Sequence, residues 1–330
     1  MHMGDALISP VVGGALFAAT AGVMTYSVKK LDKESLKSKV AYMGVAGAFV
    51  FAAQMINFSI PGTGSSGHIG GGLLLAILLG PSAGFLAMAS ILLVQALFFA
   101  DGGLLAYGAN VINMGLFTCY LAYPFIYQAF LKIKVLSMKT KIALGSFFGV
   151  VIGLQFCAFA VVIETVISGR TELPFSTFLL YMLPIHLAIG AIEGVITASI
   201  ALFLHQQQPD LLYLGRSNTV VGMKNKIVIG FMVLTLMIGG VASLYASSSP
   251  DGLEWSISNV SESFLENSDQ SFLQDVQEKL AFLPDYSFKS NPEGNAIGTS
   301  LSGIVGSITT LLLVVTVTFI IRKVSVQKRA

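Results

Sequence analysis

The stretch Ile142–Ile167, IALGSFFGVVIGLQFCAFAVVIETVI, is longer than the about 20 residues that cross the hydrocarbon core of a membrane, and it carries one charged side chain, Glu164. Such a run predicts a membrane-spanning helix. The whole chain has the same character, because its 330 residues are 54% hydrophobic and only 11% charged. Soluble domains carry about 25% charged residues. We therefore predict an all-α, polytopic membrane protein.

Apolar runs of this kind predict about nine transmembrane helices, a seven-helix bundle followed by a two-helix hairpin. The predicted spans are 7–28, 40–58, 68–80, 82–100, 108–131, 142–167, 175–204, 227–246 and 301–321. The runs 68–80 and 82–100 are separated only by Gly80-Pro81, which is a turn signal. The first of these two is short, so we expect it to be tilted or to begin below the membrane surface.

The basic residues predict the orientation of the chain. They cluster after the first, fifth, seventh and ninth spans, and nine spans place all four clusters on one side of the membrane. Only Arg170, Lys279 and Lys289 fall on the other side. By the positive-inside rule, the N-terminus and the loops 59–67 and 101–107 are then outside. We expect a multi-pass protein of the cell membrane, which in bacteria is the inner or cytoplasmic membrane.

The hydropathy pattern also predicts how the chain is divided. Residues 1–204 form a seven-helix unit, and residues 205–226 form a cytoplasmic linker with Pro209 and Gly215. Residues 227–330 form a second unit, whose two helices flank an acidic extracellular loop at 247–299. We expect this loop to be partly helical around 269–282.

A candidate metal site begins at the N-terminus with His2. Methionine aminopeptidase generally spares Met before a bulky second residue, so we expect Met1 to remain. Its amine, the His2 amide nitrogen and the His2 imidazole can then chelate one ion through fused five- and six-membered rings. Nitrogen ligands suit nickel, copper, zinc and iron. The rival interpretation is a chance histidine at a frayed terminus.

A second histidine, His68, lies in a glycine-rich loop on the same predicted outer face. The loop reads NFSIPGTGSSGHIGGG from Asn57 to Gly72, and its glycines allow close approach of backbone to a ligand. His68 can supply a fourth nitrogen, or it can simply bond the backbone of its loop. Two histidines on one face of a histidine-poor chain favour the metal site. We predict Met1, His2 and His68 as its ligands.

Two further polar residues, His186 and Glu193, are seven positions apart in the run 175–204 and share a helix face. They can form an internal relay for ions, or they can bond neighbouring helices together. The sequence has neither the Gly-Lys-Ser/Thr ending of a nucleotide-binding loop nor a zinc-protease motif. We therefore expect no catalytic residues and no catalytic cofactor in this chain.

Several motifs occur in order along the first two thirds of the chain. They are Met1-His2-Met3, Asn57–Gly62, Ser66-Gly-His68, Leu78–Pro81, Gln95–Gly103 and Gly108–Met114. With these motifs, about residues 1–215 resemble the CbiM/NikM family, the substrate-binding membrane components of cobalt and nickel energy-coupling-factor transporters. The later stretch Pro250-Asp-Gly-Leu-Glu254 resembles the extracellular motif of the small subunit CbiN/NikN, so the whole looks like a fused M–N protein.

The resemblance implies a substrate-specific component of an ATP-driven importer. In such a component the N-terminus inserts into the bundle, and Met1, His2 and His68 hold the transported Ni²⁺ or Co²⁺. The implied partners are a transmembrane coupling protein of the T/Q type and cytoplasmic ATPase subunits of the O type, and the N-type part assists metal loading. The start Met3-Gly-Asp departs from the Met-Glu-Gly start common in cobalt members, which favours nickel.

Other functions stay open at the level of the sequence. A passive metal channel or a proton-coupled divalent-metal carrier would be expected to use an intramembrane acid such as Glu193. An intramembrane enzyme would need a catalytic pair, for which only His186 and Glu193 are available. A scaffolding protein would leave the metal-binding pattern of the N-terminus unexplained.

Overall fold

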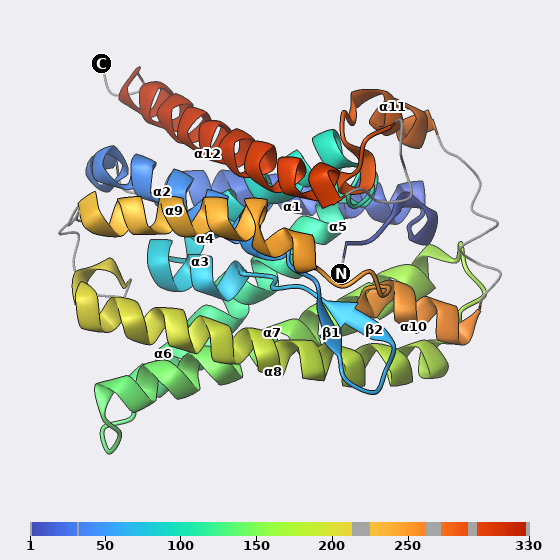
Figure 1. The fold of residues 1–330 in the computed structure, drawn as a ribbon, viewed down its shortest axis with the longest axis horizontal. Helices are drawn as coiled ribbons and strands as arrows, with labels where there is room; N and C mark the ends of the chain where they lie inside the picture. Colours follow the sequence, from blue (N-terminus) through green and yellow to red (C-terminus); the bar gives the residue numbers. More distant parts are fainter. Residues whose placement is uncertain (1, 32, 213–224, 262–271, 290–295, 328–330) are drawn as a thin grey trace.

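The structure is a computed structural model that describes residues 2–31, 33–212, 225–261, 272–289 and 296–327 (Figure 1). Within these ranges the regular secondary structure is helical except for one short hairpin, which confirms the predicted all-α membrane class. The elements in chain order are η1 (Asp5–Leu7), α1 (Pro10–Lys30), α2 (Lys33–Gln54), β1 (Phe58–Ile60), β2 (Ser65–Gly67), α3 (Gly72–Leu79), α4 (Pro81–Phe99), α5 (Tyr107–Val111), η2 (Ile112–Tyr127), α6 (Gln128–Leu131), α7 (Met138–Ser168), α8 (Phe175–Gln207), η3 (Pro209–Leu211), α9 (Asn225–Gly240), η4 (Ala242–Tyr245), α10 (Gly252–Val260), α11 (Phe272–Leu280), η6 (Pro284–Tyr286) and α12 (Ala296–Gln327).

Among the described residues, seven helical stretches are long and apolar enough to cross a membrane. They are α1, α4, the continuous helix Tyr107–Leu131, α7, α8, the stretch Asn225–Tyr245, and Ile297–Ile321 within α12. The part of α2 from Val40 to Gln54 is also apolar but shorter. These stretches correspond to eight of the nine predicted spans.

The predicted span at 68–80 is helical only from Gly72 to Leu79, so no continuous transmembrane helix forms there, and the stretch is short as expected. Its helix, α3, contains only 8 residues and ends at Gly80, which has φ 84°. At 1.5 Å per residue such a helix is about 12 Å long, whereas the hydrocarbon core is about 30 Å thick. Every residue of α3 is buried, because the helix packs against α2, α4, η2, α7 and α8. The apolar run reflects a position inside the protein rather than contact with lipid.

The two C-terminal helices form a hairpin that packs against α2. Helices α9 and α12 meet at Gly239 and Gly303, where a Cβ built on Gly239 would lie 2.9 Å from the Gly303 carbonyl carbon. No larger side chain fits such a crossing. On its other side α12 packs against α2, where a Cβ on Gly44 would meet Val315 at 2.8 Å.

We call the chain between these two helices the connecting segment (residues 246–295). Its described parts, 246–261 and 272–289, fold over one end of the bundle. Its α10 begins with a capping box formed by Asp251 and Glu254, and α11 lies inside the range where a helix was predicted. The segment adds to the β1–β2 hairpin, because Ser66 N donates to Pro250 O at 2.8 Å and Ser66 pairs with Asp251 as a parallel bridge. The connecting segment therefore lies beside the loop that carries His68.

Candidate metal centre

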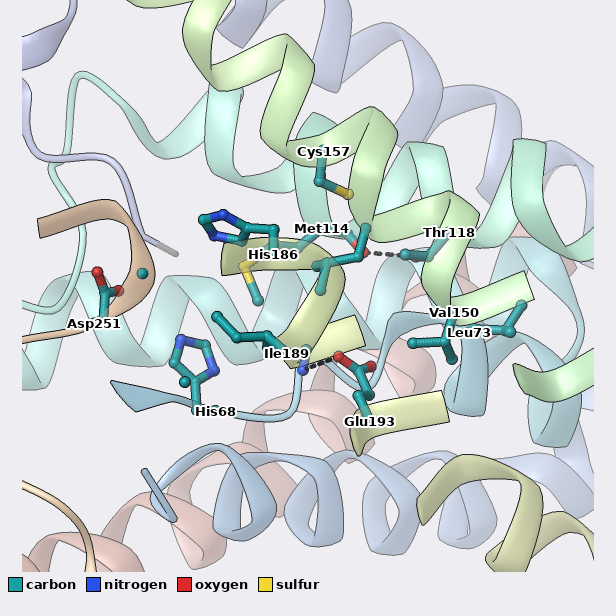
Figure 2. A pocket seen from close by; sticks show the side chains of 14 residues that line it. His68, Leu73, Met114, Thr118, Val150, Cys157, His186, Ile189, Glu193 and Asp251 are labelled. Carbon is teal, nitrogen blue, oxygen red and sulfur yellow. Dashed lines mark hydrogen bonds between the residues drawn. The ribbon is translucent and has the colours of Figure 1, made fainter. Parts of the chain in front are cut away.

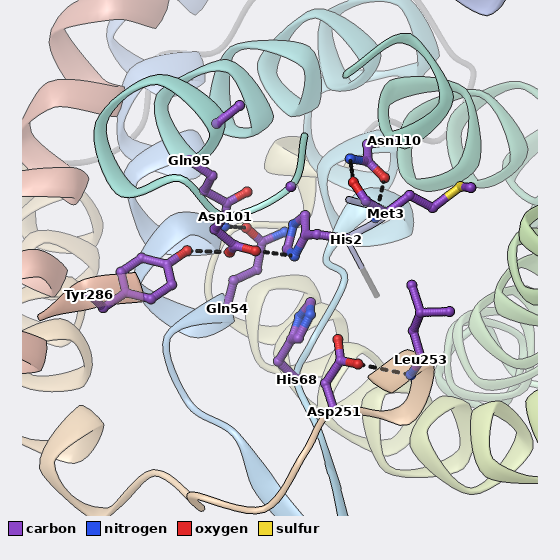
Figure 3. A network of polar contacts seen from close by, with 12 residues as sticks. His2, Met3, Gln54, His68, Gln95, Asp101, Asn110, Asp251, Leu253 and Tyr286 are labelled. Atoms are coloured by element: carbon purple, nitrogen blue, oxygen red, sulfur yellow. Dashed lines mark hydrogen bonds and ion pairs between the residues drawn. The ribbon is translucent and has the colours of Figure 1, made fainter. Parts of the chain in front are cut away.

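The start of the described chain is held inside the bundle. The Met3 N–H donates to Asn110 Oδ1 at 2.8 Å, and the Met3 carbonyl accepts from Asn110 Nδ2 at 3.1 Å and from Gly103 N at 2.9 Å. The Met3 side chain is completely buried. Because its neighbour is fixed in this way, His2 is carried into the protein rather than left at a frayed end (Figure 3).

A carboxylate secures the next turn of the chain. Asp5 Oδ1 accepts hydrogen bonds from Leu105 N at 2.8 Å and from Ala106 N at 3.0 Å. These two amides precede the helix that begins at Tyr107 and have no partners within it. The N-terminal segment and the 100–107 loop therefore fix each other.

The two predicted histidine ligands lie together. The rings of His2 and His68 are stacked, with centroids 5.2 Å apart and an interplanar angle of 11° (Figure 3). His68 Nδ1 lies 3.2 Å from the Ile69 carbonyl oxygen, which can only accept, so Nδ1 carries the hydrogen. In this tautomer the lone pair of the neutral ring is on His68 Nε2. His2 Nδ1 lies 3.1 Å from Asp101 Oδ1.

Burial and neighbouring charges shift the pKa values of His68 and Asp101. Burial lowers the pKa of His68 to about 3, so its imidazole is neutral at physiological pH and already in the form that binds metals. Burial alone would raise the pKa of Asp101, but the neighbouring His2 and the hydrogen bonds from His2 and Tyr286 hold that pKa below its usual range. Asp101 is therefore a carboxylate.

Glu193 and His186 do not pair with each other. Glu193 on α8 accepts from Gly70 N at 2.9 Å and from Gly71 N at 2.8 Å, so it holds the loop that follows His68 (Figure 2). His186 Nδ1 donates to the Met182 carbonyl of its own helix at 2.7 Å, and this leaves Nε2 as its lone-pair nitrogen. Of the two predicted roles, the Glu193 contacts favour the structural one.

A cavity of about 20 Å³ lies between these residues, with His68, His186, Glu193 and Asp251 in its lining (Figure 2). This volume suits one water molecule. The described residues include no group of three or more His, Cys, Asp or Glu side chains arranged to hold a metal. Met1, the third predicted ligand, lies outside the described residues.

The connecting segment contributes residues that the sequence did not assign to the site. Asp251 lies beside His68, and the hydroxyl of Tyr286 donates to Asp101 Oδ2 (Figure 3). Asp251 belongs to the Pro250–Glu254 motif, which is a signal that could have suggested it. Tyr286 has no local signal, because only the folding of the segment over the bundle brings it to Asp101.

An acidic cleft of about 1080 Å³ leads to His2 from the same end of the molecule. Two parts of the chain line it, the N-terminal region and the connecting segment. Its carboxylates are Asp5, Asp101, Asp251, Glu254, Asp275, Glu278 and Asp285, and its lysines are Lys279 and Lys289. The excess of carboxylates gives the cleft a negative field that favours the approach of cations.

Two family models match the sequence. The model described as the cobalt uptake substrate-specific transmembrane region, CbiM, matches residues 2–211. The chain belongs to the CbiM family. A second model, the PDGLE domain, matches residues 225–323, so this CbiM-family chain carries a PDGLE part behind its CbiM part. It is a multi-pass membrane protein of nickel and cobalt transport and not an enzyme.

Known relatives have the same fused organisation. A protein of Archaeoglobus fulgidus, provisionally named fused nickel transport protein NikMN, is 31% identical over 320 residues, covering 95% of this chain and 96% of its own. The fused nickel transport protein NikMN of Rhodobacter capsulatus is 30% identical over 224 residues, or 64% of each chain. One solved structure is also similar to this chain. It is a crystal structure of a truncated transition metal transporter, which matches with a TM-score of 0.54 and 30% sequence identity and covers 63% of this chain and 99% of its own.

Proposed function

We propose that this chain is the substrate-capturing component of an ATP-driven importer of nickel, with cobalt as the second candidate. The observation that carries the proposal is the stacked, partly buried pair of His2 and His68, of which His2 lines the acidic cleft. The named nickel transport proteins among its relatives favour nickel.

The proposed ligands are the Met1 amine, the His2 amide nitrogen, the His2 imidazole and the His68 imidazole. This set gives four nitrogens, an arrangement that suits Ni²⁺ in square-planar coordination. Two supporting facts are that the described N-terminal residues are held in the bundle and that His68 is neutral. Binding is expected to weaken in acid, because an amine and an amide must lose protons before they coordinate.

The proposal also assigns the sides of the membrane and the partner proteins. We propose that the N-terminus, the acidic cleft and the connecting segment face outside, with 205–226 as a cytoplasmic linker between the units 1–204 and 227–330. A transmembrane coupling protein and cytoplasmic ATPases would then drive release of the ion inside. Uptake by the chain without any ATPase partner would contradict this and favour a channel or carrier.

The direct test is a nickel and cobalt titration of the purified full chain with its authentic Met1 start. His2→Ala and His68→Ala are each expected to abolish tight binding, and so is a variant with extra residues before Met1. His205→Ala is the matched control, because His205 lies near the C-terminal end of α8 and away from the site. Unchanged affinity in both the His2 and the His68 variants would reject this ligand set.

A further inference from the structure

A tyrosine of the PDGLE part contacts the carboxylate that holds His2. The Tyr286 hydroxyl donates to Asp101 Oδ2, and the other oxygen of the same carboxylate, Oδ1, lies 3.1 Å from His2 Nδ1 (Figure 3). One carboxylate thus joins a residue of the second family part to a candidate ligand of the first.

The position of Tyr286 is fixed by its surroundings. Its ring stacks on Phe99 of α4, with centroids 5.1 Å apart and an interplanar angle of 22°. Asp285 and Tyr286 both have positive φ, 49° and 59°, a conformation that non-glycine residues adopt only when other contacts impose it. The strained turn is what directs the phenol into the site.

The connecting segment also fixes the loop that carries Asp101. Gln277 of α11 is buried, and its Nε2 donates to the carbonyls of Ala96 at 2.9 Å and Gly102 at 2.6 Å. Gly102, which follows Asp101, has φ 80°, and a Cβ built on it would lie 2.8 Å from Asn110 Nδ2. The loop therefore has little room to move while the segment is docked.

Metal binding requires the nitrogen that Asp101 now holds. In the proposed chelate the six-membered ring runs from the His2 amide nitrogen through Cα, Cβ and Cγ to Nδ1. The other ring nitrogen, Nε2, lies too far along the imidazole to close that ring. Nδ1 faces a carboxylate oxygen, so it donates its hydrogen to Asp101. The ion needs the lone pair of the same atom, and the Nδ1 proton therefore passes to Nε2 of the ring or to water when the ion binds.

We propose that Tyr286 is a positioning residue for metal loading, and that it acts by holding the Asp101 carboxylate when His2 Nδ1 passes from Asp101 to the ion. The inference rests on the proposed function, since it takes His2 as a ligand. Without the tyrosine hydroxyl, the partly buried Asp101 carboxylate has one hydrogen-bond donor fewer once His2 leaves. It then retains His2 more firmly, and the ion binds less well.

The first measurement uses the metal-free full chain, labelled with ¹⁵N in its histidine rings. The chain has four histidines, so single His→Gln variants can assign each signal. Tyr286→Phe keeps the aromatic ring and removes the hydroxyl, and it is expected to shift the His2 Nδ1 resonance while leaving that of His205 in place. A purely structural role of the ring would not produce this shift.

Trp255→Phe is the matched control. Trp255 belongs to the same connecting segment, and its Nε1 donates to Thr63 O at 2.9 Å, so the variant loses one docking hydrogen bond that does not reach Asp101. The His2 resonance is expected to stay unchanged in it. An equal shift in both variants would show general loosening of the segment and would overturn the inference.

The second measurement is a nickel titration of the same proteins with an authentic Met1 start. We expect Tyr286→Phe to weaken nickel binding about tenfold, near the lower end of what a hydrogen bond to a charged group contributes. An unshifted His2 resonance, or unchanged affinity, overturns the role of Tyr286. If the unsubstituted chain binds neither nickel nor cobalt, the proposed function itself fails, and this result differs from tight binding that ignores Tyr286.

Discussion

At the scale of single residues, Glu193 shows how a buried carboxylate supports the candidate site. Its side chain is only 3% exposed on a helix that is long and apolar enough to cross a membrane, where an unpaired charge is costly. The two amide hydrogens of Gly70 and Gly71 satisfy its oxygens. Gly71 has φ 75°, so the carboxylate also stabilises a left-handed turn two residues after Ile69. Glu193 thereby sets the place of His68 without touching its ring.

Replacement of Glu193 by Ala is expected to destabilise the fold and weaken nickel binding together. The buried amide of Gly71 would lose its acceptor at a cost of about 1–3 kcal/mol, and the part-buried amide of Gly70 would lose its acceptor at a smaller cost. Glu193→Gln keeps one acceptor oxygen, so it is expected to lose less stability and less nickel affinity than Glu193→Ala. Thermal unfolding in detergent and nickel titration would check this, and equal behaviour of the Ala variant and the unsubstituted chain would contradict it.

At the scale of elements, the crossing of α9 and α12 depends on the absence of side chains. Gly239 and Gly303 lie backbone to backbone, which is the way small residues allow helices to approach in membranes. Ser243 lies one turn after Gly239, and its hydroxyl donates to the Gly239 carbonyl. This crossing anchors the PDGLE part, because both helices also pack against α2.

Gly303→Ala is expected to force the two helices apart and to destabilise the hairpin by about 1–3 kcal/mol, the usual cost of overpacking. Gly230→Ala in α9 is the matched control, because nothing lies within 4 Å of a Cβ at that position. Gly230→Ala should leave the stability unchanged or raise it by up to about 1 kcal/mol, because alanine has a higher helix propensity than glycine. Thermal unfolding of both variants in one detergent compares them, and equal melting would speak against a tight crossing.

At the scale of the whole molecule, the CbiM part and the connecting segment together build the acidic cleft. Neither part supplies all of its carboxylates, since Asp5 and Asp101 come from the first and Asp275, Glu278 and Asp285 from the second. A field summed over such a cleft acts mainly on the rate at which cations arrive. Residues of both parts therefore shape the path by which a cation enters as well as the candidate site that it reaches.

The double variant Asp275→Asn with Glu278→Gln is expected to slow nickel association severalfold at low salt and to leave dissociation unchanged. Both residues are exposed, so the fold should tolerate the change. The difference should vanish near 1 M salt, where the Debye length falls to about 3 Å. Lys279→Gln should act in the opposite direction. Stopped-flow mixing measures both rates, and an equal slowing at high salt would exclude a field effect.

Some residues of the candidate site could be predicted from the sequence, and others could not because they come from distant parts of the chain. The imidazoles of His2 and His68 are metal-binding groups in any context, so a candidate metal site could be predicted from their residue types and their common predicted side, while nickel or cobalt came from the family resemblance. Asp101, Asp251 and Tyr286 are ordinary residues in the sequence. They join the candidate site only because the connecting segment docks on the bundle, and docking depends on contacts between distant positions.

The sequence by itself determined that this protein is helical and crosses a membrane, because an apolar run must bury its backbone hydrogen bonds in a helix wherever it meets lipid. It could not separate a helix that faces lipid from one enclosed by protein, since both are equally apolar, and α3 was therefore taken for a span. Only the tertiary structure decided that the eight residues of α3 are enclosed by five neighbouring elements. It likewise decided that Glu193 serves the His68 loop and that the PDGLE part reaches His2 through Asp101, because packing alone brings these distant residues together.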